Sequence, residues 1–309
     1  MNILVLGGAG FIGRHLCAAL IHAGHQVTSL DLLPAGGRVA WPDIPGVSWR
    51  SGDFTNVVDT AAALVEVELV VHLISTTLPK SSNDNPLYDL QENVGGTLQL
   101  LDLMVRQPNR PRIIFLSSGG TIYGVPRQIP IPEEHPTEPL CAYGIGKLAI
   151  EKYLALYQHL HGLDYRVLRL ANPYGEHQSY RSSQGVIPVF LYKALQGEAI
   201  EVWGDGTVIR DYIYIDDAVQ AIMATICYDG PERIFNIGDG KGYSLNELID
   251  ITRRLVANDI PCTYLSTRAC DVPVNILNIS RARQELGWQP VTALERGMTR
   301  LLEHLRDVR

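Results

Sequence analysis

Residues 3–13 read Ile-Leu-Val-Leu-Gly-Gly-Ala-Gly-Phe-Ile-Gly, an apolar run that passes into three regularly spaced glycines. The run predicts a buried parallel strand, and the helical spacing of apolar residues beyond it predicts a helix. In such a unit Gly7 permits the tight turn, Gly10 lets a pyrophosphate approach the backbone, and Gly13 lets helix and strand pack closely. The stretch therefore predicts a dinucleotide-binding site at the start of an α/β fold.

A carboxylate follows the second predicted strand. That strand covers residues 26–30 and ends at Asp31, about 20 residues beyond the glycine turn. An acidic side chain there hydrogen-bonds the ribose hydroxyls and repels a 2′-phosphate, so NAD is favoured over NADP. Further strands, predicted at 47–50, 69–74, 113–118 and 165–170, complete a Rossmann-type doubly wound parallel sheet.

The composition is that of an ordinary globular protein. Of 309 residues, 46% are hydrophobic and 19% are charged. The net charge of −7 argues against a nucleic-acid partner. The five cysteines form no Cys-x-x-Cys pair, and no run of 18 apolar residues occurs. We expect a soluble cytoplasmic protein with reduced cysteines, no membrane partner and no metal.

A second motif, Tyr143-Gly-Ile-Gly-Lys147, lies in a helix predicted to begin near Ala142. Positions i and i+4 share one helical face, so the phenol and the ammonium point the same way. A free tyrosine is a poor base, because its pKa is about 10. A neighbouring ammonium and an oxidised nicotinamide would both lower that pKa. The pair is therefore predicted to remove a proton from a substrate hydroxyl.

These motifs resemble the extended short-chain dehydrogenases/reductases, in the NAD-dependent epimerase/dehydratase family and nearest to its UDP-glucose (UDP-galactose) 4-epimerases. The resemblance covers essentially the whole chain, and it includes Asn172-Pro-Tyr-Gly175, residues 204–217, Arg268-Ala-Cys-Asp-Val-Pro273 and residues 286–290. It implies an NAD-binding Rossmann domain over 1–172 that residues 210–240 rejoin. It also implies a smaller mixed α/β domain over 173–309 that binds a nucleotide sugar, and a homodimer formed through the helices around 93–105 and 143–160.

The resemblance assigns cofactor contacts residue by residue. Lys147 is expected to bond the nicotinamide ribose as well as to assist Tyr143. Asp53 is expected to hydrogen-bond the adenine amino group, with a strand-end cap as the alternative. The expected cofactor-binding set is Gly7, Gly10, Phe11, Ile12, Gly13, Asp31, Asp53, Phe54, Leu73, Asn93, Tyr143, Lys147 and Pro173.

The resemblance also assigns substrate contacts. Arg210 and Arg268 are expected to bind the diphosphate, because a guanidinium suits bidentate phosphate contacts. Asn275 stands where bacterial galactose epimerases carry a tyrosine that excludes N-acetyl groups, so UDP-N-acetylhexosamines are expected to fit. The expected substrate-binding set is Thr77, Asn172, Val186, Trp203, Arg210, Arg268, Asp271 and Asn275.

The chain departs from the family at Gly119, where relatives usually place a serine or threonine hydroxyl. Alternation along an extended segment makes Thr121 the first candidate for the missing catalytic hydroxyl and Ser118 the second. Family dehydratases carry Asp-Glu where this chain has Gly120-Thr121, so 4,6-dehydration would lack its acid and base.

The predicted function is an NAD-dependent UDP-hexose 4-epimerase that works through a transient 4-keto intermediate. The alternatives are an NAD(P)H-dependent nucleotide-4-keto-sugar reductase and a non-catalytic dinucleotide-binding protein. The identity of the sugar stays open at this point.

Overall fold

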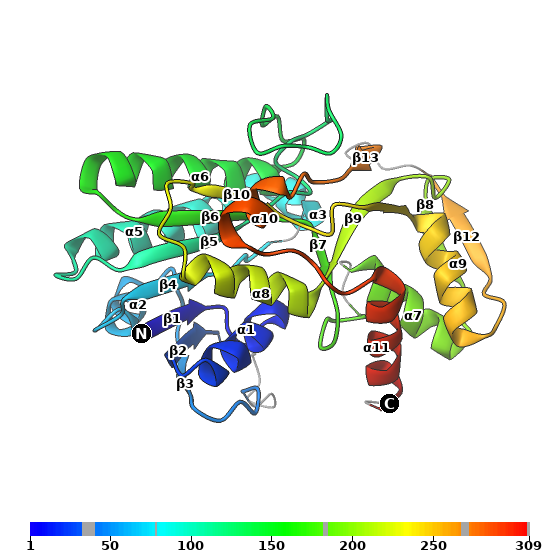
Figure 1. Ribbon diagram of the computed structural model, residues 1–309, viewed down its shortest axis with the longest axis horizontal. Coiled ribbons are helices and arrows are strands. Elements are labelled where there is room, and N and C mark those ends of the chain that lie inside the picture. The colour runs from blue at the N-terminus through cyan, green and yellow to red at the C-terminus, as the bar shows by residue number, and fades with distance from the viewer. Residues whose placement is uncertain (33–40, 78, 182–184, 267–271, 308–309) are drawn as a thin grey trace. The chain divides into compact units, whose positions relative to one another are not determined.

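The structure, a computed structural model, describes residues 1–32, 41–77, 79–181, 185–266 and 272–307 (Figure 1). The chain forms two compact units, the first made of Met1–Ile122, Pro139–Arg169 and Ile222–Phe235, and the second of Tyr123–Glu138, Leu170–Ala221 and Asn236–Arg309. No helix in the described ranges is long and apolar enough to span a membrane.

This division differs from the expected one in three places. The second unit already begins at Leu170 rather than at residue 173. The segment that returns to the first unit is 222–235 rather than 210–240, and residues 123–138 join the second unit. The proline-rich loop 123–138 belongs there because Ile131 donates its N–H to the carbonyl of Ile276 at 2.8 Å and accepts from the N–H of Asn278 at 2.8 Å.

The first unit is built on a seven-stranded sheet with the order β10-β6-β5-β4-β1-β2-β3. This confirms the predicted doubly wound parallel sheet. The strands that follow β1 in the chain are added first on one side of it (β2, β3) and then on the other (β4, β5, β6). The strand order therefore reverses between β1 and β4, and ligands bind in such sheets at the carboxyl ends of these two strands. The strands are β1 (Asn2–Leu6), β2 (Gln26–Asp31), β3 (Val47–Ser51), β4 (Leu69–His72), β5 (Arg112–Ser118), β6 (Tyr165–Leu170) and β10 (Ile234–Ile237).

Helices flank this sheet, and Figure 1 shows α5 and α6 running side by side along it. All four residues of β4 are buried, as a strand covered on both faces requires. The core between sheet and helices includes Leu6, Phe115, Leu100 and Leu154. The helices are α1 (Phe11–His22), α2 (Val57–Ala63), α3 (Pro79–Asp84), α4 (Pro86–Asp89), the π-helical segment η1 (Leu90–Gly95), α5 (Gly96–Arg106), α6 (Ala142–His161) and the end of α8 (Ile215–Ile226), of which residues 222–226 belong to this unit.

A buried ion pair fixes α6 against β6. Nη2 of Arg169 lies 2.7 Å from Oε2 of Glu151, and the two side chains are 3% and 2% exposed. The Ser117 hydroxyl donates a further hydrogen bond to Oε1 of Glu151 at 2.5 Å. Because a buried charge is costly without its partner, this contact defines where α6 lies on the sheet.

The second unit is organised around β9 (Ile209–Tyr214). This strand pairs with β11 (Gly242–Ser244) in antiparallel fashion, and in parallel fashion with β7 (Asn172–Tyr174) and β13 (Val274–Asn275). A separate parallel pair joins β8 (Ile200–Trp203) to β12 (Cys262–Leu265). The helices are α7 (Val186–Gln196), α9 (Leu245–Val256), α10 (Ser280–Leu286) and α11 (Leu294–Asp307).

Asp211 in β9 ties three backbone segments together. Its carboxylate accepts N–H groups from Asp239 at 2.8 Å, Gly240 at 3.1 Å and Leu277 at 3.2 Å. Burial raises the pKa of Asp211 to about 7. These bonds hold β9, and with it the predicted phosphate ligand Arg210, in place within the unit.

Candidate active site

The glycine turn lies between β1 and α1. Gly7 adopts a left-handed φ of +88°, which favours glycine. A Cβ on Gly13 would lie 2.1 Å from the Gly7 carbonyl oxygen, so only glycine permits this approach of helix to strand. A Cβ on Gly10 would meet only that same oxygen, at 3.3 Å, so the space beside Gly10 is otherwise open.

The first turn of α1 is suited to a phosphate. Gly10 is its N-cap and has no side chain with which to bond the first amides of the helix. N–H groups at the start of a helix point outward, and the helix dipole favours an anion there. The open space at Gly10 and these amides fit a dinucleotide pyrophosphate. Phe11 and Ile12, also predicted to bind the cofactor, are the first two residues of this helix and are partly buried.

Asp31 lies beside this turn, at the end of β2. Its Oδ2 accepts the N–H of Ala9 at 2.9 Å, and its Oδ1 accepts the N–H of Leu32 at 2.9 Å. Burial raises the pKa of the carboxyl group, while the two amides act in the opposite direction. The carboxylate is therefore fixed where the ribose contact is predicted.

Asp53 and Phe54 follow β3. Oδ1 of Asp53 accepts the N–H of Thr55 at 2.9 Å and its hydroxyl at 2.8 Å, which is the strand-end cap considered as the alternative role. Phe54 is 4% exposed, and its ring lies 5.5 Å from that of His72 in the core. The predicted adenine contact at Asp53 remains a prediction, and the side chain of Phe54 serves packing.

The loop after β4 reaches the glycine turn. Leu73 donates its N–H to the carbonyl of Leu6 at 3.0 Å, at the carboxyl edge of the sheet. The backbone nitrogen of Ile74 lies 3.4 Å from the ideal Cβ position of Gly7. The next residue, Ser75, donates its hydroxyl to the carbonyl of Thr77 at 3.0 Å and lies near the Tyr143 phenol, whose pKa it lowers. The glycine turn and the predicted base are thus brought together within the first unit.

The Tyr143 and Lys147 side chains lie on one face of α6, as predicted from their spacing. Nζ of Lys147 lies 5.6 Å from the centroid of the Tyr143 ring and 4.7 Å from that of Phe115, and it donates to the carbonyl of Leu116 at 2.9 Å. Burial lowers the pKa of Lys147 to about 8, while the negative charges of Asp89 and Glu151 act in the opposite direction.

The pKa of Tyr143 is raised in the protein alone, whereas from the sequence we expect it to be lowered. Burial raises the pKa of Tyr143 to about 12; the nearby Cys141 and Asp89 raise it too, and the nearby Ser75 lowers it. The sequence shows the ammonium but not the burial of the phenol, and the lowering expected with bound NAD stays a prediction. Proton abstraction at neutral pH therefore needs a further positive charge near the phenol.

Thr77, predicted to bind the substrate, and Asn93, predicted to bind the cofactor, are hydrogen-bonded to each other. The hydroxyl of Thr77 donates to Oδ1 of Asp89, and Nδ2 of Asn93 donates to that oxygen at 3.1 Å and to the Thr77 hydroxyl at 3.2 Å. Oδ1 of Asn93 accepts the N–H of Thr76 at 2.9 Å. This network closes the loop after β4 against α4 and η1. Asp89 was missed in the sequence, although its position four residues before Asn93 was a usable signal.

The missing hydroxyl at Gly119 has three candidates in the structure. The Thr121 hydroxyl is buried and has no hydrogen-bond partner in the described part of the chain. The Thr121 carbonyl oxygen lies 2.8 Å from the ideal Cβ position of Gly144, in the first turn of α6. Ser118 ends β5, and its carbonyl accepts the N–H of Ile122 at 3.3 Å. Ser75, which the sequence did not suggest, is the hydroxyl that lies near the Tyr143 phenol.

Six of the predicted residues that the structure describes belong to the second unit. Nη1 of Arg210 donates to the carbonyls of Ile209 at 2.9 Å and Val272 at 2.7 Å, which fixes its guanidinium from one side. Arg268 and Asp271 lie outside the described residues. Asn172 donates to the Asp211 carbonyl at 2.9 Å, and the carbonyl of Pro173 accepts from Gln178 at 3.1 Å. Asn275 is buried in β13, where it pairs with Arg210 of β9. Val186 begins α7, and Trp203 ends β8.

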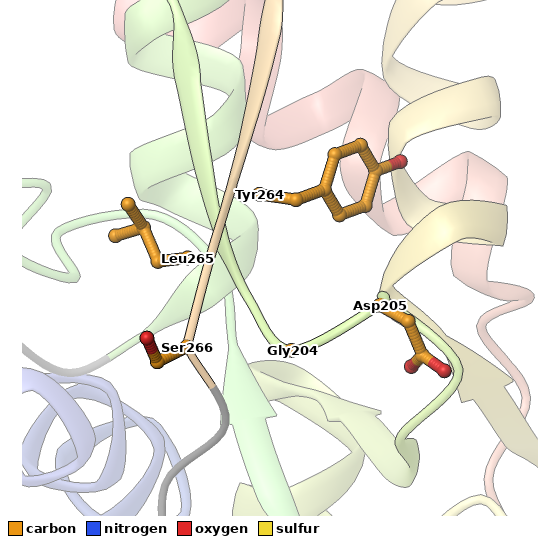
Figure 2. Close-up of a pocket in the computed structure, with 5 residues that line it drawn as sticks. All are labelled: Gly204, Asp205, Tyr264, Leu265 and Ser266. Carbon is orange, nitrogen blue, oxygen red and sulfur yellow. The ribbon is translucent and has the colours of Figure 1, made fainter.

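A cavity of about 570 Å³ lies beside Trp203, at the ends of β8 and β12. Figure 2 shows Tyr264 and Leu265 pointing to opposite sides of β12, as strand alternation requires. The Trp203 side chain is 41% exposed. The cavity is lined by Gly204, Asp205, Tyr264, Leu265 and Ser266.

Comparison with known sequences places this chain in a family. The profile of the NAD dependent epimerase/dehydratase family matches residues 3–238. A putative UDP-glucose 4-epimerase of Methanocaldococcus jannaschii is 35% identical over 306 residues, 99% of this chain and 98% of that protein. A dTDP-4-dehydro-6-deoxyglucose reductase of Escherichia coli is 33% identical over 317 residues, 99% of this chain and 98% of the relative.

Comparison with solved structures also finds UDP-glucose 4-epimerases among the similar proteins. The UDP-glucose 4-epimerase of Thermotoga maritima, solved with UDP-glucose, has a TM-score of 0.93 and 34% identity, over 100% of this chain and 99% of that one. The UDP-glucose 4-epimerase of Thermus thermophilus, solved with NAD, has a TM-score of 0.91 and 29% identity over 100% of both chains.

Proposed function

The chain belongs to the NAD-dependent epimerase/dehydratase family, and from this premise we propose that it is a UDP-hexose 4-epimerase that works through a transient 4-keto sugar. One observation carries the proposal: the Tyr143–Lys147 pair lies on α6 beside the loop after β4, and this loop contacts the glycine turn. Epimer formation at C4 needs a base and a dinucleotide at one place. The 4-epimerases among the similar proteins support this assignment.

The first unit supplies the NAD site. The open space at Gly10, the amides at the start of α1 and the Asp31 carboxylate suit the pyrophosphate and ribose of the cofactor. When bound, NAD supplies the two-electron oxidation and re-reduction of the sugar at C4.

Tyr143 takes the proton of the 4-hydroxyl and returns it to the epimeric alcohol. Ser75 lies near its phenol and lowers its pKa, and the Lys147 ammonium lies 5.6 Å from its ring centroid. The pKa of Tyr143 has to fall from about 12 for this role, and a positive charge bound beside it acts in that direction. Lys147 contributes a fixed charge and a hydrogen-bond donor.

Arg210 is proposed as a ligand of the substrate diphosphate. Two backbone carbonyls already fix one face of its guanidinium, which suits a bidentate contact to phosphate. Arg268 is proposed as the second diphosphate ligand, Asp271 as a ribose ligand, and Asn275 as the residue that leaves room for an N-acetyl group. The sugar can then turn over while its diphosphate stays bound.

A 4-keto-sugar reductase is the second candidate. Gly119 lacks the hydroxyl of the usual epimerase site, and the Escherichia coli relative is a dTDP-4-dehydro-6-deoxyglucose reductase. A reductase would release oxidised cofactor after each turnover, whereas an epimerase recycles it.

One experiment distinguishes the 4-epimerase from the 4-keto-sugar reductase. The purified protein is incubated without added cofactor with UDP-glucose, UDP-N-acetylglucosamine or UDP-glucuronate, and the anomeric protons are followed by NMR. A galacto-configured product establishes a 4-epimerase with resident NAD and identifies its sugar. No conversion even with NAD supplied, together with turnover of a 4-keto sugar by NAD(P)H, identifies the reductase.

Helix α6 also carries an apolar stripe that supports the proposed homodimer. Ile145, Tyr153, Leu156 and Leu160 are 54%, 37%, 42% and 59% exposed, and their spacing places them on one helical face. Large apolar side chains gathered on one exposed face mark a protein contact. The Tyr157 hydroxyl donates to Asp102 at 2.5 Å, which ties α6 to α5 beside this stripe.

Leu156→Glu is expected to convert the dimer into a monomer, because it would bury a charge at the centre of the stripe. Light scattering coupled to size exclusion at micromolar concentration measures the change. The control is Ala155→Glu, which adds the same charge on α6 off the stripe and should leave the mass at that of a dimer. If Leu156→Glu and Ala155→Glu had the same molecular mass in solution, α6 would not form the dimer interface.

A further inference from the structure

A buried carboxylate in β9 binds backbone groups from two other segments of the second unit. Asp211 has an exposed fraction of 0%. Its Oδ1 accepts the N–H of Asp239 at 2.8 Å, and its Oδ2 accepts the N–H groups of Gly240 at 3.1 Å and Leu277 at 3.2 Å. Both carboxylate oxygens are therefore used by backbone amides, as polar atoms buried away from water require.

One of these segments, residues 272–277, is fastened to β9 near both of its ends. At one end Nη1 of Arg210 donates to the carbonyl of Val272 at 2.7 Å. At the other end the N–H of Leu277 donates to Asp211. Between these contacts lies the two-residue strand β13, in which Asn275 pairs with Arg210. The place of Asn275 beside Arg210 therefore depends on both end contacts.

Asp211 is also bonded to the segment that carries Asn172. Nδ2 of Asn172 donates to the Asp211 carbonyl at 2.9 Å, and β7 pairs with β9 in parallel fashion. Asn172, Arg210 and Asn275 are the described residues predicted to bind the substrate that lie in the four-stranded sheet of this unit. Each is bonded to Asp211 directly, is adjacent to it in the chain, or lies on a segment that Asp211 holds.

The turn at residues 238–240 fits closely around the carboxylate. A Cβ on Gly238 would lie 2.6 Å from Oδ2 and 3.0 Å from Oδ1 of Asp211. Contacts below 3.0 Å essentially never occur for a real Cβ, so glycine is what lets this turn approach the side chain. The carboxylate therefore has little freedom to take another position.

We propose that Asp211 is a positioning residue for the substrate: it holds Asn172, Arg210 and Asn275 in one arrangement, so the affinity for the nucleotide diphosphate depends on it. The inference rests on the proposed function, in which Arg210 binds the diphosphate of the substrate. All but one of the residues predicted to bind NAD lie in the first unit, the exception being Pro173. The affinity for NAD should therefore depend little on Asp211.

Asp211→Asn tests the proposal, because its NH2 group cannot accept from a backbone N–H and at least one of the three bonds is lost. Binding of UDP to the NAD-loaded protein is measured by calorimetry at pH 8. Burial raises the pKa of Asp211 to about 7, so the wild-type carboxylate is ionised at this pH. The affinity for UDP should fall by about tenfold or more, and the affinity for NAD should stay within about twofold. In turnover of a UDP-hexose the change should appear in KM rather than in kcat.

Asp217→Asn is the matched control, because Asp217 is a second buried carboxylate of this unit that binds backbone amides. It is 3% exposed and accepts the N–H groups of Val291 at 3.2 Å and Thr292 at 2.9 Å. Both variants should melt at a lower temperature than the wild type, but Asp217→Asn should bind UDP as the wild type does. An equal loss of UDP affinity in the two variants would mean general loosening of the unit and would overturn the proposal.

The proposal would also be overturned if Asp211→Asn bound UDP as tightly as the wild type. A wild-type protein that binds NAD but not UDP gives a different result: it contradicts the proposed function, and the inference with it. The wild-type titration thus distinguishes failure of the proposed function from failure of the role of Asp211.

Gly238→Ala keeps the test decisive if Asp211→Asn does not fold. Gly238 does not have a left-handed φ, so an alanine there is opposed only by its contact with Asp211. The methyl group should push Oδ2 away from Gly240 and Leu277 while the charge is kept. The affinity for UDP should then fall while that for NAD is retained, and an unchanged affinity for UDP would contradict the proposed role.

Discussion

Tyr143→Phe should lower kcat for epimerisation by about 10²–10⁴-fold, the range that a positioned general base contributes. The phenol on α6 lies near Ser75, in the loop that contacts the glycine turn, and phenylalanine keeps the ring near Lys147 while removing the ionisable oxygen. The rate of the wild-type enzyme should rise with pH over its acid limb, because the working form is the phenolate. That rise should be absent in the variant.

The matched control is Tyr157→Phe, which removes a hydroxyl from the same helix. Tyr157 bonds Asp102 at 2.5 Å and takes no part in the proposed chemistry, so this variant should keep the wild-type kcat. Binding of NAD, measured by calorimetry, should be unchanged in Tyr157→Phe and retained in Tyr143→Phe. A Tyr143→Phe enzyme with more than a tenth of the wild-type kcat would show that another group removes the proton.

The sequence predicts most of the first unit because its signals are local. The spacing of Gly7, Gly10 and Gly13 reports a turn whose atoms are close in the chain, and the structure shows why Gly13 can carry no side chain. Tyr143 and Lys147 share a helical face by periodicity alone. The same locality explains the seven-stranded sheet, since each buried strand is one apolar run.

What the sequence leaves out depends on contacts between distant segments. Burial decides the pKa of Tyr143, and Asp89 and Ser75 reach the base only because the loop after β4 lies against α6. The loop 123–138 joins the second unit through hydrogen bonds of Ile131 to residues more than 140 positions away, which no local pattern reports.

Gly13→Ala and Gly10→Ala should fail in different ways, although both add one methyl group to the same turn. The methyl at position 13 would lie 2.1 Å from the Gly7 carbonyl oxygen, a backbone atom that cannot move without shifting β1 or α1. Overpacking of this kind costs about 3 kcal/mol or more, so the melting temperature should fall by roughly 5–10 °C. Thermal unfolding followed by circular dichroism measures this loss.

The methyl at position 10 meets only the Gly7 oxygen, at 3.3 Å, so Gly10→Ala should fold and melt within about 2 °C of the wild type. It stands in the space where a pyrophosphate would approach the backbone, so the affinity for NAD should fall by about tenfold or more in calorimetry. Fold and cofactor binding are thus separated by two glycines three residues apart. If Gly10→Ala bound NAD as the wild type does, the pyrophosphate would have to approach another part of the turn.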